Sequence, residues 1–401
     1  MQSKDKELKA IVDPCERCGA CLPVCPLYAV TGREIAVARG KNAVVRALLE
    51  EGIEADEAVS KALDFCLLCK ACVTACPNKV KTDEAMELAR QKVAEKVGNS
   101  FAHKATGTLM QSPALIKLAS TAIDLTKAVK LDRLIGKIVP LGLPEQYQSV
   151  LAGPRALPSN PDYRASKPKE FKKVAYFKGC AMKLFFPEVA ESTIKVLQRV
   201  SEVCVPESVC CGMPHIAHGM GDTADELAQT TIETFAGYDD IITDCGSCGG
   251  ALKSYAKRFV HDEKWASLAE DFSRKVMGFT EYLAMVGYEP QIKQAVTVTY
   301  HDSCHLVRGQ GIKNPPRVLL KKAADYREMP GADTCCGGAG TFNIDFPEAS
   351  DKVLAEKVNN IKKTGAIVVA TECPACMLQL ARAAGKNGFK VAHISQVLSN
   401  S

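Results

Sequence analysis

The chain has 401 residues, more than one ordinary domain, and its length suggests two or three domains. Hydrophobic residues make up 47% and charged residues 24%, which argues against a disordered chain or a coiled coil. Lys and Arg number 51 against 46 Asp and Glu, a formal charge of +5, so nucleic acid is not an expected partner. The unusual figure is 19 cysteines against a single tryptophan. These cysteines must be disulfides, metal ligands or reactive thiols.

The cellular compartment decides between these uses of cysteine. Residues 1–10 carry no apolar core of the kind found in signal peptides. No uninterrupted apolar stretch approaches the ~18 residues that suggest a transmembrane helix. We therefore expect a cytoplasmic protein, in which thiols stay reduced, and an odd number of cysteines fits a complete disulfide framework poorly. Metal binding is the leading interpretation.

Residues 1–100 contain two identical cysteine runs and are predicted to form one two-cluster domain. Each run has the spacing C-x2-C-x2-C-x3-C-P, and the two comprise Cys15, Cys18, Cys21 and Cys25, then Cys66, Cys69, Cys72 and Cys76. In such runs three thiolates hold one [4Fe–4S] cubane cluster and the fourth ligates the other cluster. The spacing thus predicts a cluster on Cys15, Cys18, Cys21 and Cys76, and another on Cys66, Cys69, Cys72 and Cys25. Zinc is the alternative, but its sites usually use two separate C-x2-C pairs.

Helical patterns surround these runs and continue beyond them. Apolar residues recur at helical spacing within residues 43–49 and 83–97, so helices are expected to cradle the clusters. Residues 101–170 contain no cysteine. Within them, residues 114–139 predict a basic amphipathic helix, which either packs on its own domain, docks a partner or lies on a membrane surface. Repeated prolines from residue 140 predict an extended linker to residue 170.

The rest of the chain is an internal repeat, predicted as two domains over residues 171–290 and 291–401. Equivalent cysteines of the copies lie 124 to 128 positions apart. The first copy carries Cys180, Cys210, Cys211, Cys245 and Cys248, and the second carries Cys304, Cys335, Cys336, Cys373 and Cys376. Five sulfurs per copy exceed what one tetrahedral zinc ion requires, although a structural zinc site is the alternative for either copy.

Short β-branched or aromatic runs precede four of these cysteines and are followed by helical patterns. They occupy residues 174–177, 241–243, 296–300 and 367–370. This alternation predicts parallel α/β units, in which ligands gather at the carboxyl ends of strands. The expected fold class is therefore multidomain: an α-helical ferredoxin-like domain followed by a duplicated α/β domain with parallel sheets.

Taken together, these motifs resemble the iron–sulfur oxidoreductases with paired CCG domains. The segments that carry the resemblance are CERCGACLPVCP, CLLCKACVTACP, FKGC, CCGMP, CGSC, YHDSCHLVR, CCGGAGTF and CPAC. Their order is similar to that in the iron–sulfur subunits of glycolate oxidase, D-lactate dehydrogenase and anaerobic glycerol-3-phosphate dehydrogenase. The catalytic iron–sulfur subunit of heterodisulfide reductase has the same layout.

The resemblance implies further clusters and a partner chain. By position, each set of five cysteines would hold one noncubane [4Fe–4S] cluster, with zinc as the alternative in one of them. Both CxxC halves, Cys245 with Cys248 and Cys373 with Cys376, are intact, which is more like heterodisulfide reductase. Two cubane sets of four and two sets of five leave only Cys204 unassigned, and it is interpreted as a small buried hydrophobe.

Several functions are compatible with this interpretation. Because the chain has no G-x-G-x-x-G segment and no P-loop, flavin chemistry is expected in another polypeptide. The favoured hypothesis is the electron-transfer subunit of a flavin-dependent 2-hydroxy-acid dehydrogenase, with an FAD-containing partner and a quinone or other carrier as acceptor. It would be cytoplasmic or peripheral at the inner face of the membrane. One alternative is a reductase that splits a disulfide at a noncubane cluster. The others are the iron–sulfur subunit of a glycerol-3-phosphate dehydrogenase, and a redox relay whose CCG domains hold zinc and serve only as an assembly scaffold.

Four histidines lie near the cysteine motifs: His215, His218, His301 and His305. A histidine there can manage protons near a substrate, because its pKa is close to physiological pH. More often it hydrogen-bonds a cluster sulfur or the backbone and tunes the reduction potential. No residue is therefore assigned as catalytic.

Overall fold

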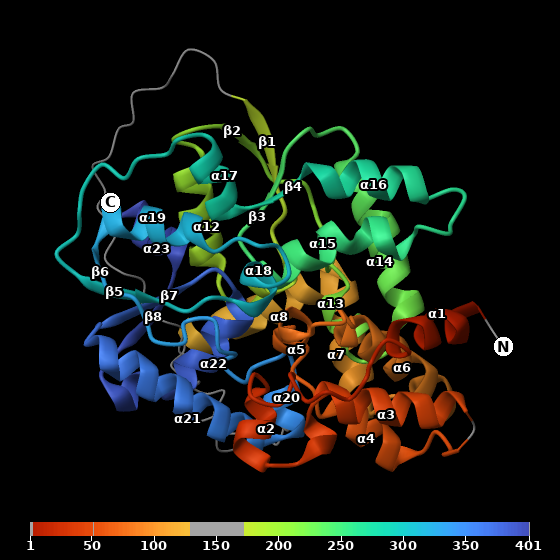
Figure 1. The fold of residues 1–401 in the computed structure, drawn as a ribbon. Coiled ribbons are helices and arrows are strands. Elements are labelled where there is room, and N and C mark those ends of the chain that lie inside the picture. The colour runs from red at the N-terminus through yellow and green to blue at the C-terminus, as the bar shows by residue number, and fades with distance from the viewer. Residues whose placement is uncertain (1–2, 51, 129–171, 401) are drawn as a thin grey trace. The chain divides into compact units, whose positions relative to one another are not determined.

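The computed structural model describes residues 3–50, 52–128 and 172–400, and the chain divides into two units (Figure 1). Unit 1 comprises residues 1–108, 212–226 and 334–356. Unit 2 comprises residues 109–211, 227–333 and 357–401. The predicted linker, residues 140–170, lies outside the described residues, as does the predicted helix beyond residue 128. The predicted domain limits at residues 100, 170 and 290 stay predictions.

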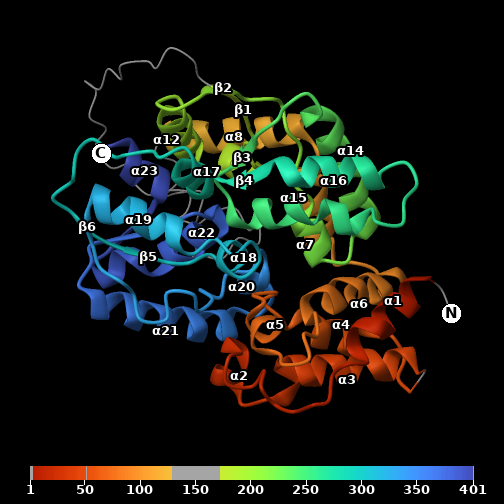
Figure 2. The ribbon, with the colours of Figure 1, turned by 45° about the horizontal axis from the view of Figure 1, so that its top comes forward.

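Unit 1 is helical, as predicted for the region of the cysteine runs. Its longer N-terminal helices pack together (Figure 2) and are α1 (Ser3–Val12), α3 (Ala38–Leu49), α4 (Glu57–Asp64) and α6 (Thr82–Val97). Their buried faces share one apolar core made of Leu8, Val12, Val45, Leu48, Leu63, Leu68, Ala85, Met86, Ala89 and Val93. The helical patterns at residues 43–49 and 83–97 are confirmed.

Short elements connect these helices and carry the cysteine runs. They are α2 (Pro26–Thr31), η1 (Glu34–Ala36) and α5 (Ala71–Ala75), with α7 (Phe101–Gln111) following α6. Local sequence explains their ends. Pro26 stands in the first turn of α2 and Gly32 ends that helix at φ 65°, a left-handed conformation that suits glycine. Asp56 caps α4 by accepting a 2.8 Å hydrogen bond from the backbone N–H of Val59.

Two later segments complete unit 1. Residues 212–226 contain α13 (Met213–Ala217) and the start of α14 (Gly221–Phe235), and residues 334–356 contain α20 (Phe342–Asp345) and much of α21 (Pro347–Thr364). Ala217 packs against the apolar core. The rings of Phe342 and Phe346 lie 5.7 and 5.0 Å from that of Phe65. The sequence that directly follows the first Cys-Cys pair is therefore part of the ferredoxin-like unit.

Unit 2 contains two parallel four-stranded sheets of identical topology. Sheet A has the order β2-β1-β3-β4, and its strands are β1 (Lys173–Tyr176), β2 (Glu202–Cys204), β3 (Ile241–Thr243) and β4 (Val276–Gly278). Sheet B has the order β6-β5-β7-β8, and its strands are β5 (Thr297–Tyr300), β6 (Asp325–Tyr326), β7 (Val368–Thr371) and β8 (Lys390–His393). The predicted parallel sheets and the four predicted strands are confirmed.

Helices follow the strands, as parallel connections require. In the first copy they are α11 (Cys180–Leu184), α12 (Pro187–Leu197), α15 (Gly246–Arg258), α16 (Ala266–Lys275) and α17 (Phe279–Met285). In the second copy they are α18 (Cys304–Val307), α19 (Asn314–Ala323), α22 (Pro374–Ala384), η3 (Gly385–Asn387) and α23 (Ile394–Ser399). Helix α8 (Pro113–Ala128), the described part of the predicted amphipathic helix, packs against α11. Within the described ranges, no helix has the length and apolar character needed to cross a membrane.

Candidate metal centres

The cysteines of the N-terminal runs meet in two neighbouring cavities of unit 1. One cavity is lined by Cys15, Cys18 and Cys21, and Cys76 of the other run joins them. The second is lined by Cys66, Cys69 and Cys72, together with Cys25 of the first run. The fourth cysteine of each run thus lies beside the first three of the other, which is the exchange that the spacing predicts. Cys72 lines both cavities, so the two sites are immediate neighbours.

An arginine fixes the start of each cysteine run. Arg46 donates hydrogen bonds to the carbonyl oxygens of Val12, Asp13 and Cys15, at 2.8, 3.0 and 2.9 Å. Arg90, with its side chain 6% exposed, does the same at the second run. Charge-assisted donors of this kind are stronger than neutral ones, so both loops are held by contacts that are independent of a metal ligand.

The contacts of Arg90 reach further than those of Arg46. Its guanidinium donates to the carbonyl oxygens of Leu63 at 2.9 Å and Cys66 at 3.0 Å, and it pairs with the Asp64 carboxylate at 3.4 Å. It also donates to the carbonyl oxygen of Ala217 at 2.8 Å. Arg90 therefore ties the loop of Cys66 to the segment that follows Cys210 and Cys211 in the sequence. Neither arginine was identified from the sequence.

A buried lysine stands beside the cavity of Cys66. Lys41 is 1% exposed, lines that cavity and donates to the carbonyl oxygen of Ala62. Burial lowers the pKa of Lys41 to about 8, against the opposing influence of Cys66. Burial likewise raises the pKa of the Cys25 thiol. A cation at this depth is suited to compensate negative charge carried by bound thiolates.

Strand ends bring the cysteines of the first CCG copy together in unit 2. Cys180 begins α11 shortly after β1, and Cys245 caps α15 directly after β3. The Sγ atoms of Cys180 and Cys210 lie 3.6 Å apart. The neighbouring Cys180 and Cys211 thiols raise the pKa of Cys210, and Cys211 raises that of Cys248. The backbone N–H of Cys248 donates to Cys245 Sγ at 3.3 Å. All five predicted cysteines of this copy thus converge in a buried cluster of thiols.

The second copy repeats this arrangement at the ends of β5 and β7. Cys304 begins α18, Cys373 caps α22, and Cys376 lies in the first turn of α22. Hydrogen bonds from the thiols of Cys245 and Cys376 hold the pKa of Cys373 well below its usual range. Cys335 and Cys336 belong to unit 1, so their place in a five-cysteine site stays a prediction. Cys204, in strand β2, pairs with Ala175 in the sheet.

Two buried carboxyl groups support the CxxC segments and were not identified from the sequence. Asp244 and Glu372 directly precede Cys245 and Cys373, and both are 0% exposed. Tyr176 and Thr193 each donate to Asp244 at 2.7 Å. Thr280 donates to Glu372 at 2.5 Å through its hydroxyl. Burial raises the pKa of Glu372 to about 8 and raises that of Asp244 as well. In the sequence, these two acids could have been found only by aligning the two repeats, where they occupy equivalent positions.

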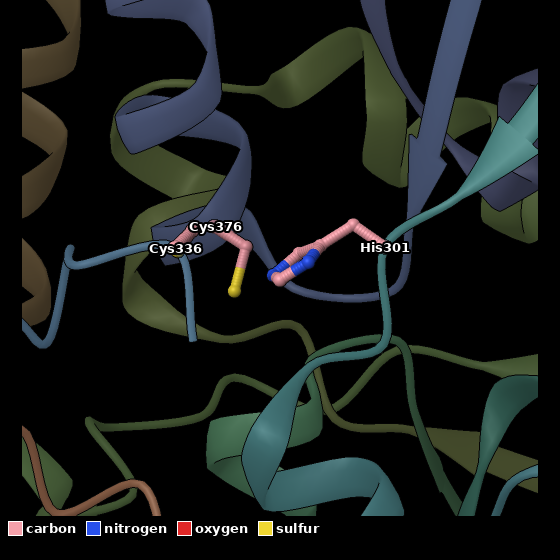
Figure 3. A group of neighbouring side chains, drawn as sticks. All are labelled: His301, Cys336 and Cys376. Atoms are coloured by element: carbon pink, nitrogen blue, oxygen red, sulfur yellow. The ribbon is translucent and has the colours of Figure 1, made fainter. Parts of the chain in front are cut away.

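The four histidines noted in the sequence have different surroundings. His215 Nε2 lies 3.1 Å from the carbonyl oxygen of Gly107, and His218 Nε2 lies 3.1 Å from the Thr341 hydroxyl. His301 is fully buried, and Figure 3 draws it with Cys336 and Cys376. A ring nitrogen of His301 and Sγ of Cys376, both in unit 2, lie within 4.8 Å. His305 follows Cys304 in helix α18, and we assign it no role in metal binding.

The donor set suits iron–sulfur chemistry. Soft thiolates are the ligands of Fe–S clusters and of zinc, and the described cysteines are all free of disulfide bonds. In both units cysteines of the predicted sets lie close to one another, and nearly all of them are buried or half-buried. Bringing so many thiols together without a metal would crowd groups that repel when ionised. The residues therefore fit thiolate-bound metal centres.

Comparison with known proteins agrees with this chemistry. Residues 11–80 match the 4Fe-4S dicluster domain, and residues 174–253 and 298–381 match the CCG cysteine-rich domain. The chain is 33% identical over 411 residues to the "Probable glycolate oxidase iron-sulfur subunit" of Bacillus subtilis (strain 168), covering 96% of this chain and 92% of the relative. It is also 33% identical over 237 residues to "Lactate utilization protein A" of Bacillus cereus (strain G9842), covering 57% of this chain and 99% of that protein.

Fold and site together define an iron–sulfur protein of the oxidoreductase class, built from a dicluster ferredoxin-like domain and two CCG domains. The chain belongs to the CCG-domain family that includes the glycolate oxidase iron–sulfur subunit and lactate utilization protein A. The predicted family and fold class are confirmed.

Proposed function

We propose that the chain is the iron–sulfur electron-transfer subunit of a flavin-dependent dehydrogenase that oxidises a 2-hydroxy acid of the D-lactate or glycolate type. The names of its relatives support this substrate class. The first of them matches nearly the whole length of both chains, so the support extends to the complete arrangement of domains.

The structural observation that carries the proposal is the direct contact between redox sites. In unit 1, Cys25 and Cys76 exchange between the two cavities, and Cys72 lines both. In unit 2, the two CCG copies meet beside Cys245 and Cys373: the Gly246 N–H donates to the Glu372 carbonyl at 2.8 Å, and Ser247 Oγ lies 3.5 Å from Cys373 Sγ. Electron tunnelling weakens steeply with distance, so neighbouring sites suit electron transfer. A protein that only stored metal would have no need of such pairing.

The cofactors of the proposed subunit are two [4Fe–4S] cubane clusters in unit 1 and one or two noncubane [4Fe–4S] clusters in the CCG domains, with zinc as the alternative in one domain. When bound, they accept and donate single electrons. The chain's own residues supply the thiolate ligands, the arginines that hold the loops and the buried Lys41 beside the cavity of Cys66. The ligands would be the eight cysteines of the runs and the ten of the repeat.

The partner in this proposal is an FAD-containing dehydrogenase subunit, and the acceptor is a quinone or another carrier. A quinone acceptor would favour a position at the inner face of the membrane. Helix α8 offers modest support, because its Leu115 and Leu118 side chains are 39% and 68% exposed beside Lys117. The same helix also packs against α11, so a purely structural role competes with membrane contact.

A second candidate function is cleavage of a disulfide at a CCG site. The observation that favours it is the complete set of five converging cysteines in the first copy, including Cys245 and Cys248. Electron transfer alone does not require this completeness in both copies. In the first function a reduced flavin donates electrons to the sites, and in the second the sites donate electrons to a disulfide. One experiment therefore separates the two functions.

The test is anaerobic purification from the native host, with identification of co-purifying chains and with iron, sulfide and zinc analysis. About sixteen irons per chain are expected from four four-iron clusters, together with a flavoprotein. About eight irons plus zinc would contradict noncubane clusters in both CCG domains. Reduction of a mixed disulfide by the isolated chain would favour the second candidate instead.

A further inference from the structure

His301 and Phe177 hold equivalent positions in the two CCG copies. Phe177 directly follows β1, and His301 directly follows β5. The backbone N–H of Phe177 donates to Ile242 at 2.8 Å, and that of His301 donates to Ala370 at 2.9 Å. Each residue stands three positions before the first cysteine of its copy, and both are fully buried. The first copy therefore has a phenylalanine at the position that a histidine occupies in the second copy.

The imidazole of His301 lacks the hydrogen bonds that a buried histidine needs. Neither ring nitrogen has a partner among the residues that the structure describes, although the side chain is 0% exposed. The other fully buried histidines are different: His215 lies against the carbonyl oxygen of Gly107, and His393 contacts both Ser395 and Asp244. Burying a polar group without a hydrogen-bond partner carries a desolvation cost, so a ligand is the natural partner for His301.

The ring is aimed at the cysteines of the second site. Figure 3 shows it extending from the end of β5 toward Cys376, and the ligand atoms of the two residues lie within 4.8 Å. A small side-chain rotation would let one metal ion bind both, because metal–sulfur and metal–nitrogen bonds are roughly 2.0–2.3 Å long. Phe177, at the equivalent position of the first copy, carries no such donor.

We propose that His301 supplies a nitrogen ligand to the metal centre of the second CCG site. This rests on the proposed metal binding at Cys304, Cys373 and Cys376. The first site then has sulfur ligands only, while the second has mixed sulfur and nitrogen ligation. A neutral imidazole contributes no negative charge, whereas a thiolate contributes one, so histidine ligation raises a reduction potential. The second site would thus be the better electron acceptor of the two.

The proposal is tested on the intact chain, purified anaerobically after growth with ¹⁵N-histidine. Pulsed EPR of the reduced protein is expected to show a nitrogen hyperfine coupling that changes from ¹⁴N to ¹⁵N on labelling. The coupling should be lost in His301→Phe, which installs the residue that the first copy accommodates. It should persist in the control His261→Phe, because His261 is exposed on the surface. Where the second site holds zinc, X-ray absorption at the zinc edge should show one nitrogen that the same variant removes.

Metal analysis of the same samples separates failure of this inference from failure of the proposed function. A second site that holds iron or zinc with sulfur ligands alone would overturn the nitrogen ligand and leave the electron-transfer proposal intact. A chain with no metal beyond the roughly eight irons expected for two cubanes would overturn this inference together with the clusters proposed for the CCG domains, whereas cubanes that a flavoprotein cannot reduce would overturn the proposed function. The labelled wild-type protein gives its answer without any substitution, so poor folding of a variant cannot decide the result.

Discussion

Ser247 of the first CCG copy contacts Cys373 of the second within unit 2: Ser247 Oγ lies 3.5 Å from Cys373 Sγ. A backbone hydrogen bond lies beside this contact, in which the Gly246 N–H donates to the Glu372 carbonyl at 2.8 Å. These residues adjoin or include Cys245 and Cys373, which hold equivalent positions in the two repeats. Metal centres at the two cysteine sites would therefore lie next to each other, as electron transfer between them requires.

Cys25 and Cys76 each line the cavity of the other cysteine run. This exchange predicts that the iron losses of single and double cysteine variants are not additive. Cys76→Ala is expected to remove about four irons. Adding Cys15→Ala should remove no more, because both residues line the same cavity. Adding Cys66→Ala instead should bring the loss to about eight. Iron analysis with EPR measures this, and Cys204→Ala, outside both runs, should keep the full content. The reverse pattern, in which the Cys15→Ala double variant loses about eight irons and the Cys66→Ala double variant only about four, would contradict the exchange.

Arg90 is expected to be essential for the stability of the loop of Cys66. Arg90→Met would leave the carbonyl groups of Leu63, Cys66 and Ala217 without their buried donor and Asp64 without its partner. Loss of one partner of a buried, hydrogen-bonded pair costs about 3–5 kcal/mol. Anaerobic denaturant unfolding measures the change.

The matched control for this variant is Arg274→Met. Arg274 is exposed and pairs with Asp271, so its loss is expected to cost less than about 1 kcal/mol. Similar losses in both variants would refute the role of Arg90.

Lys41 is expected to raise the reduction potential of the cluster in the cavity that it lines. Its buried ammonium compensates negative charge, and reduction adds one more negative charge. In Lys41→Met the potential should fall by roughly 60 mV or more, a factor of about ten in the one-electron equilibrium. Lys41→Arg should restore most of the shift. The measurement is an EPR-monitored redox titration, and an unchanged potential in Lys41→Met would show that the charge is already screened.

His218 predicts a loss of stability in mild acid. Burial lowers its pKa to about 3, and the charge of nearby His103 contributes in the same direction. The unfolded chain binds a proton near pH 6.5 while the folded protein does not. This contribution is therefore fully present above pH 6.5 and falls by about 1.4 kcal/mol per pH unit as the pH drops toward 3. Unfolding free energies between pH 7 and 5 should show this slope, and His218→Gln should flatten it. Identical slopes in the two proteins would contradict the buried neutral state.

The cysteine motifs could be found in the sequence because metal-ligand spacing is local and specific. The runs that begin at Cys15 and Cys66 line the two cavities. In the repeat, Cys245 and Cys373 follow the ends of predicted strands. The supporting residues were not predictable in this way. Arg46 and Arg90 are ordinary helix formers in the sequence, and only tertiary packing reveals that their guanidinium groups bind carbonyls of distant loops.

The aligned repeats show that His301 stands where the first copy has Phe177. They do not show that the imidazole of His301 is buried, and it is this burial that indicates a ligand. An exposed histidine beside a cysteine would need no ligand, whereas a fully buried ring without hydrogen bonds does. Strands β2, β4, β6 and β8 were missed for a different reason: none of them leads directly into a cysteine of the repeat motifs, as the four predicted strands do. Each is two to four residues long, and without an adjoining motif so short a run has little periodicity to distinguish it from a loop.

One kinetic experiment tests the electron-transfer function most directly. The anaerobically purified chain is mixed with its co-purifying flavoprotein and then with D-lactate or glycolate, and cluster bleaching is followed by stopped-flow absorbance with parallel EPR. The proposed function predicts substrate-dependent reduction of the clusters that requires the flavoprotein. Clusters that stay oxidised while the flavin becomes reduced, in a protein whose metal content is complete, would contradict it.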